Sequence, residues 1–421
     1  MEKTLGDRID FVDPAEGDKL LGAFRAVCGI RGVVVLIHAP VGCHWGVNYI
    51  ERLSSIKTNA TISALRERSV IFGGEENLRR TIEIIFKRRR RRYLILLSGS
   101  VPTVIGEDCR GTVGCLDFPI NFINIDCGGY LGKMGDGFEE ALCALFEWIE
   151  DPDPKIRGRV LSVNLIGLQR DIVKGRAGVE EIKRMLALLG IRVNAVFPPS
   201  TLSEIRRGSN ARLNIVFGYG KGLAERMKQR WETPYIYFDA YPYGTFGVDE
   251  LVEAVMNGLK IDVVRKNKIE REKEKVLRII KKAHLYLPSL YGLGVAISGD
   301  LPQVKGMSRF LQRELGMEIQ LLNITSAPPS IGALNLNNFS ASNIFIQDSW
   351  HRFASKLRAE NIGLIFGTDL ERRISSELGI PLILWSFPTI SRIDLTSNPY
   401  LGLRGVIGLV EEIVNSLLNY G

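Results

Sequence analysis

The sequence predicts an α/β protein made of three doubly wound, Rossmann-like domains with mostly parallel sheets. Short apolar runs of strand length alternate with segments of helical period over almost the whole chain, and Gly, Pro and Asp bound these runs. A chain of 421 residues is longer than most domains built around one hydrophobic core. Its hydrophobic content of 45% is enough to form several cores of normal size. We therefore expect domains at residues 1–154, 155–262 and 285–421, with a connecting helix at 263–284.

The first block contains three apolar runs that predict buried strands. These are Val33–Ile37, Tyr93–Leu97 and Phe122–Ile125. The segment Glu75–Phe86 between the first two places apolar side chains on one helical face, and residues 137–149 predict another helix. The block should end at the linker 151–155, because two prolines in four residues remove amide donors and stop a helix.

The second and third blocks repeat the pattern. Strands are expected at Val160–Ile166, Val193–Phe197, Asn214–Phe217, Tyr235–Phe238, Gly294–Ser298, Glu318–Asn323, Gly363–Phe366 and Pro381–Trp385. The charged stretch Arg265–Lys282 predicts an exposed helix between the blocks, and Gly405–Leu418 predicts a closing helix. In such sheets ligands bind beyond the carboxyl ends of the strands, and clefts between the domains are the largest candidates.

Composition and charge argue against a nucleic-acid-binding protein, a membrane-spanning protein and a secreted protein. The chain carries 55 Lys and Arg against 47 Asp and Glu, and part of the excess lies in the run Lys87–Arg92. Because this run follows a predicted helix, we interpret it as solvated cations at a helix end and expect no nucleic-acid binding. No stretch of 18 apolar residues occurs and the N-terminus is too polar for a signal peptide, so we expect a cytoplasmic protein without a membrane span.

A loop after the first predicted strand carries the first chemical cluster. It contains His38, Cys43 and His44 together with Pro and Gly. Cys43 could be a nucleophile with His38 or His44 as its base, a metal ligand, or an inert buried thiol, and spacing alone leaves these open.

A second cluster, at residues 98–108, follows the next strand. Gly106 precedes Glu107 and Asp108, an arrangement typical of a turn before a helix N-terminus. Free amides there stabilise acidic side chains, so these carboxylates need no catalytic role.

The other cysteines are less informative. Six Cys are too few for a disulfide scaffold, and the spacing of Cys109 and Cys115 matches no common zinc pattern. Cys28 and Cys143 are expected in helix cores, whereas Cys127 follows a strand and could approach a ligand. With only four His in the chain, a multi-histidine metal site is not expected.

Several motifs together resemble the nitrogenase component 1 superfamily. They are HAPVGC at 38–43, VIFGGEENL at 70–78, VIGED at 104–108, CGGY at 127–130, TPYIYF at 233–238, GIPLI at 379–383 and PYLGLRG at 399–405. The superfamily includes nitrogenase subunits, cofactor scaffold proteins, dark-operative protochlorophyllide and chlorophyllide reductases, and a nickel-sirohydrochlorin reductive cyclase.

The resemblance implies three α/β domains, paired subunits and an iron–sulfur cluster at the subunit junction, expected here to be of the 4Fe-4S type. It also implies an ATP-dependent iron protein that docks there and delivers electrons. In cluster-rich members three cysteines serve the junction. This chain keeps the middle one, Cys43, and has Lys19 and Ser100 at the other two positions. A serine hydroxyl is a poor substitute for a thiolate on iron.

The positions of catalytic cofactor ligands depart from the family as well. Phe217 and Arg392 stand where a cysteine and a histidine would bind an iron–molybdenum-type cofactor, so none is expected on this chain. We expect Phe217 and Arg392, with His38, to line a substrate cleft between the domains.

The favoured function is a nitrogenase-like oxidoreductase subunit that receives electrons through the junction cluster and reduces a bound substrate. The alternative is a non-catalytic scaffold or partner subunit for a metallocofactor. A small-ligand binder outside the family is a third hypothesis, although the chain lacks a dinucleotide or P-loop motif.

Ligand number decides the expected assembly. A four-iron cluster usually takes four protein ligands, and this chain offers one clear thiolate. A heteromer with a paralogous three-cysteine subunit reaches four, so it is favoured over a homodimer, in which Ser100 or another weak ligand would have to contribute twice. Whether Ser100 or Cys127 contributes to the cluster is left open by the sequence.

Overall fold

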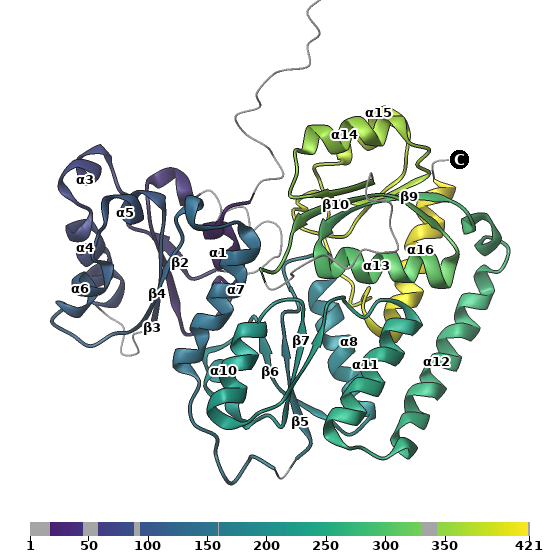
Figure 1. Cartoon of the computed structure of the whole chain (residues 1–421), viewed down its shortest axis with the longest axis horizontal. Coiled ribbons are helices and arrows are strands. Elements are labelled where there is room, and N and C mark those ends of the chain that lie inside the picture. The colour runs from purple at the N-terminus through teal and green to yellow at the C-terminus, as the bar shows by residue number, and fades with distance from the viewer. Residues whose placement is uncertain (1–16, 45–57, 88–92, 159, 330–342, 420–421) are drawn as a thin grey trace, which may run out of the picture.

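The computed structural model describes residues 17–44, 58–87, 93–158, 160–329 and 343–419. The prediction of three α/β units is confirmed: the described strands form three separate, entirely parallel sheets, each flanked by helices (Figure 1). Most of the basic run, at 88–92, and the N-terminal stretch 1–16 lie outside the described residues.

The first sheet has the strand order β2-β1-β3-β4. Its strands are β1 (Val34–His38), β2 (Ala60–Ile62), β3 (Tyr93–Ser98) and β4 (Asn121–Asp126). Its helices are α1 (Lys19–Val27), α3 (Glu67–Phe72), α4 (Glu75–Phe86), α5 (Ser100–Ile105), α6 (Cys109–Gly114) and α7 (Met134–Ala144). The helix predicted at Glu75–Phe86 has these bounds because its buried residues Leu78, Ile82 and Phe86 form one stripe. The sequence did not predict β2, which has only three residues.

The second sheet has the order β6-β5-β7-β8. Its strands are β5 (Ser162–Ile166), β6 (Arg192–Phe197), β7 (Leu213–Phe217) and β8 (Tyr235–Phe238). Its helices are α8 (Gly175–Leu188), α9 (Leu202–Arg206), α10 (Lys221–Trp231) and α11 (Gly244–Leu259). The charged connector is α12 (Asn267–Ile280), which buries only Ile269 and Val276 along one side, as an exposed helix should.

The third sheet has the Rossmann order β11-β10-β9-β12-β13. Its strands are β9 (Gly294–Asp300), β10 (Glu318–Ser326), β11 (Ile344–Ile346), β12 (Leu364–Gly367) and β13 (Leu382–Leu384). Its helices are α13 (Leu301–Leu315), α14 (Trp350–Ala359), α15 (Arg372–Leu378) and α16 (Gly402–Leu418).

The last helix does not stay within the third unit. α16 packs against α8 and α11 of the second unit and against α12, so it joins two units that the sequence treats as separate (Figure 1). Gly178 on α8 leaves space for Leu401, since a methyl group at Gly178 would lie 3.0 Å from the Leu401 Cδ1. The end of the chain therefore fixes the second unit against the third.

Glycines allow α1 and α7 to pack unusually closely beside the first sheet. A methyl group at Gly22 would lie 1.8 Å from the Met134 carbonyl oxygen, and one at Gly137 would lie 1.9 Å from that of Lys19. Side chains at these positions would force the helices apart. This contact holds the start of α1 next to the loops that follow β1 and β4.

Within the described residues, no helix has the length and apolar character that crossing a membrane requires.

Candidate functional site

Cys43 lies on a short 3-10 turn, Val41–His44, that follows β1. The turn is closed by the Cys43 amide, which donates to the Pro40 carbonyl at 3.0 Å. The residue is exposed. Partial shielding from water, and then the nearby Asp18 carboxylate, raise the pKa of its thiol.

The Cys43 turn forms one rim of a cavity of about 420 Å³, which we call the Cys43 hollow. Its walls come from the start of α1, the end of β1 and the glycine-rich loop after β4. The lining residues include Leu20, Leu21, Phe24, Ile37, Gly129, Gly132 and Lys133. A thiol thus lines a largely apolar depression at the carboxyl edge of the first sheet, where ligands of such sheets bind.

Ser100 begins α5 at the edge of this hollow. Its Oγ accepts a hydrogen bond of 2.9 Å from the Gly129 amide, and Gly129 lines the hollow. The structure therefore places Ser100 next to a residue that lines the hollow, although Ser100 itself does not line it. In this structure the Ser100 hydroxyl binds the Gly129 amide, so its role here is to hold the loop after β4 in place.

Lys19, at the position where the family has its first cysteine, is buried at the start of α1. Its ammonium lies 2.6 Å from a Glu140 carboxylate oxygen. This pair joins α1 to α7, and the Lys19 ammonium has no lone pair with which to bind iron.

The remaining thiols do not line the Cys43 hollow. Cys127 is fully buried, and burial strongly raises the pKa of its thiol. Cys28 is buried in the core as predicted, whereas Cys143 is only half-buried. Cys109 is buried and Cys115 is exposed. Within the described residues, Cys43 is thus the one thiol in this hollow.

His38 is fully buried and does not line the hollow, which goes against its prediction as a substrate-cleft residue. Its Nδ1 lies 2.7 Å from the Ser63 Oγ, and its Nε2 lies 2.5 Å from a Glu107 oxygen. Burial lowers the pKa of His38, although Glu107 acts in the opposite direction. With both ring nitrogens occupied inside the fold, His38 has none left to act as a base for Cys43.

Glu107 has a role that the sequence did not reveal. Besides His38, its carboxylate accepts from the Gly74 amide at the start of α4, while Asp108 caps α6 through the Gly111 amide at 2.8 Å. His38, Glu107 and Cys109 could present three donor atoms to a metal within 4.8 Å of one another. The direct His38–Glu107 contact fills the space between two of them, so the cluster acts as a hydrogen-bonded anchor for the Cys43 loop.

Phe217 ends β7 and is fully buried. Its ring stacks on Phe238 at 5.5 Å between centroids and meets Tyr241 edge-on. It lines none of the described cavities, so the expectation that it faces a substrate cleft is not met.

Arg392 lines a small cavity of about 140 Å³ between the loop after β5 and the segment before α16. Its guanidinium donates to both Glu412 oxygens, at 2.7 and 3.1 Å. Arg392 therefore lies between the second and third units, where a carboxylate of α16 holds it; its role as a substrate-cleft residue stays a prediction.

A buried polar network occupies the centre where the three units meet. Arg25 of α1 binds Asp171 of the second unit through Nε at 2.6 Å and Nη2 at 3.2 Å. Gln169 then donates to Asp300 of the third unit at 3.0 Å, and the Tyr219 hydroxyl donates to the same oxygen at 2.8 Å. The sequence did not indicate this network, because its members are far apart in the chain and no local motif marks them.

Asp300 should make the stability of the fold depend on pH. Burial raises its pKa from 3.8 to about 6, although Arg25 favours the charged form. A carboxyl with a raised pKa contributes most below its unfolded pKa, and the contribution is lost as pH rises through about 6. We expect the stability of wild type relative to Asp300→Asn to fall by about 1 kcal/mol between pH 5 and 7.5, measured by urea unfolding. Parallel pH profiles for the two proteins would contradict it.

The family assignment now has a direct basis. Residues 19–418 match the model of the family described as nitrogenase component 1 type oxidoreductase. The chain belongs to this family. The matched range includes all three sheets and the Cys43 turn, so the component 1-type fold accounts for the whole described architecture.

Similar proteins include chains of two kinds of enzyme. This component 1-type chain is 24% identical to the nitrogenase molybdenum-iron protein beta chain of Frankia alni, over 99% of this chain and 84% of that one. It is 23% identical to one of the subunits of the light-independent protochlorophyllide reductase of Methylobacterium sp. (strain 4-46), over 96% and 80%. A solved structure described as nitrogenase Cp1 at pH 6.5 shares the fold, with a TM-score of 0.83, 20% identity and coverage of 99% and 95%.

Proposed function

We propose that this chain is a subunit of a component 1-type reductase and contributes Cys43 as one ligand of an iron–sulfur cluster shared with a second subunit. The observation that supports this most is the position of the thiol: it is exposed, it lies at the carboxyl edge of the first sheet, and it lines an apolar hollow of about 420 Å³. A thiolate in this place suits iron, which binds cysteine sulfur in such clusters.

The side chains at the hollow can supply one ligand of a cluster, but not a complete set of ligands. In the part of the chain that the structure describes, the hollow contains no second thiol, and the Asp18 carboxylate accepts from the Leu21 amide at 2.8 Å to cap α1. Three further ligands would have to come from a partner, because a four-iron cluster usually takes four. We infer a heteromer with a paralogous subunit, since the relatives are named as single chains of enzymes that have more than one kind of chain.

The chain's own residues would prepare this junction. Leu20, Leu21 and Phe24 give an apolar wall that excludes water, and Gly129 leaves backbone close to the thiol. When bound, an iron–sulfur cluster supplies a one-electron relay whose potential depends on hydrogen bonds and exposure. We propose that electrons reach it from an ATP-dependent iron protein and pass to a substrate held in the assembled complex. The scaffold alternative is not favoured, since the relatives are named as chains of reductases and nitrogenases.

Anaerobic purification of the chain, alone and co-expressed with a three-cysteine paralogue, tests this proposal. We expect iron and sulfide near zero for the chain alone and about four iron atoms per heteromeric pair, because the pair completes the ligand set. Iron analysis is combined with mass measurement of the same samples. A stable homodimer with an intact cluster would overturn the heteromer, and colourless, iron-free samples in both cases would overturn the cluster.

A further inference from the structure

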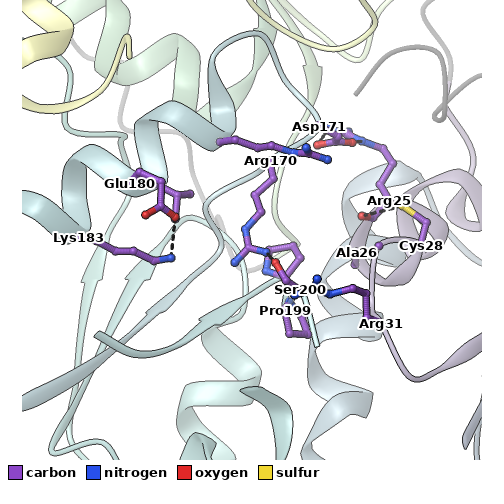
Figure 2. A pocket seen from close by; sticks show the side chains of 14 residues that line it. Arg25, Ala26, Cys28, Arg31, Arg170, Asp171, Glu180, Lys183, Pro199 and Ser200 are labelled. Atoms are coloured by element: carbon purple, nitrogen blue, oxygen red, sulfur yellow. Dashed lines mark hydrogen bonds and ion pairs between the residues drawn. The ribbon is translucent and has the colours of Figure 1, made fainter. Parts of the chain in front are cut away.

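A second large cavity lies at the other end of α1 from the Cys43 hollow. It has a volume of about 480 Å³, within the range of small-molecule sites. Its walls are the end of α1 with Arg25 and the segment after it with Arg31, the loop after β5 with Arg170, the helix α8, and the loop after β6 with Pro199 and Ser200 (Figure 2). It therefore opens beyond the carboxyl ends of β5 and β6, where ligands bind in sheets of this kind.

The lining is strongly cationic. Five cationic side chains, Arg25, Arg31, Arg170, Arg176 and Lys183, face two acidic ones, Asp171 and Glu180. Each acid is already engaged, because Asp171 pairs with Arg25, and Glu180 lies 2.7 Å from the Lys183 ammonium. Arg31 and Arg170 add positive charge to the cavity that these two acids do not neutralise.

Arg170 and Arg31 are the arginines most available to a ligand. Arg170 is half-buried and donates to the Ser200 hydroxyl, and Arg31 reaches toward Ser200 from the opposite wall (Figure 2). Neither has a carboxylate within 4.0 Å among the residues that the structure describes. Burial lowers the pKa of Arg170; Glu204 and Glu180 oppose this, and Arg176 acts in the same direction as burial. An anion bound beside Arg170 would favour its charged form.

The backbone holds these two walls together. The Arg31 amide donates to the Ser200 carbonyl at 2.9 Å, and the Leu202 amide donates to the Arg31 carbonyl at 3.1 Å. The first unit is thus bonded to the loop after β6, so the backbone of Arg31 is held beside Ser200, the residue to which the Arg170 guanidinium donates. Two guanidinium groups on either side of one loop suit a planar or tetrahedral oxyanion, to which arginine can donate two parallel hydrogen bonds.

We propose that this cavity, which we call the arginine pocket, binds a small molecule with at least two oxyanion groups of the phosphate or carboxylate type between Arg31 and Arg170. The Ser200 hydroxyl would add a neutral hydrogen bond, and Pro198 and Pro199 would form the rigid apolar side of the site. This site does not depend on iron at Cys43, since the two cavities share no lining residue.

Calorimetric titration of the full chain tests the arginine pocket. The probes are pyrophosphate and malonate, which carry two phosphate or two carboxylate groups, each at ionic strength balanced with sodium chloride. We expect saturable binding of at least one probe, weakened about tenfold or more by Arg170→Gln and by Arg31→Gln, because hydrogen bonds between charged groups are the strong ones. The probe that binds identifies the oxyanion type.

The matched control is Arg192→Gln, which removes an exposed arginine at the opposite end of β6. It removes the same net charge, so it should leave the affinity unchanged. Circular dichroism checks that each variant folds, and the conservative Arg170→Lys should retain part of the affinity. Absence of saturable binding for both probes, or equal weakening by Arg192→Gln, would overturn the proposal.

Discussion

Cys43→Ala should abolish the iron–sulfur absorption of the assembled heteromer and reduce its iron content to background. The reason is that Cys43 is the one thiol of this chain at the Cys43 hollow within the described residues, so no neighbouring sulfur can replace it. The visible spectrum and the iron-to-protein ratio of anaerobically purified complex measure the effect. Because the side chain is exposed, the substitution should change the unfolding midpoint little.

Cys115→Ala is the matched control, since Cys115 is also exposed but lies outside the hollow. It should leave absorption and iron unchanged, as should Cys28→Ala if the variant folds. Equal loss of iron in Cys43→Ala and Cys115→Ala would show that purification damage, and not ligation, is being measured. Retention of the full cluster in Cys43→Ala would refute the assignment of this residue.

Arg25→Met is expected to destabilise the fold by about 3–5 kcal/mol, because it leaves the Asp171 carboxylate buried without its partner. The side chains of Arg25 and Asp171 are 1% and 4% exposed, so water cannot replace the lost contact. The guanidinium also lies 3.9 Å from the Phe387 ring centroid, which joins α1 to the third unit. Urea unfolding of the chain measures the loss.

A second variant separates the uncompensated charge from the lost packing. Arg25→Met combined with Asp171→Asn should recover a large part of the stability, because the buried negative charge is gone. Arg79→Met, which breaks exposed pairs with Glu76 and Glu83, should change stability little. If the double variant were no more stable than Arg25→Met, the buried charge would not be the cause.

Much of the architecture could be predicted because its signals are local. The helix at Glu75–Phe86 and the strand Tyr235–Phe238 have the predicted bounds, since a helical stripe and a bounded apolar run each lie within a dozen residues. The strands β2 and β11 were not predicted. β13 has the same length, but it lies within the longer apolar run Pro381–Trp385, which did predict a strand. Cys43 and Ser100 both follow strands of the first sheet, as the sequence indicated, but only Cys43 lines the hollow.

The assignment of Phe217 to a cleft depended on counting along the chain, and the structure places Phe217 in the core at the end of β7. His38 was expected in the loop after the first strand, but it is the last residue of β1 and is enclosed by Ser63 and Glu107. At a strand end, a side chain can face either the helix layer or the solvent. Which way the side chain points depends on the local twist of the strand and on neighbouring residues, and counting positions along the chain takes neither into account.

By itself the sequence determined the three parallel sheets, the family resemblance and the position of the Cys43 thiol after the first strand, because each depends on contiguous residues. Only the tertiary structure decided that α16 joins the second and third units, that Arg25, Asp171 and Asp300 meet at the centre, and that Arg31 and Arg170 face one cavity. These contacts form between residues far apart in the chain. These contacts form because helices and sheets pack against one another through complementary surfaces. A local sequence pattern does not indicate which distant helix or strand a side chain will contact.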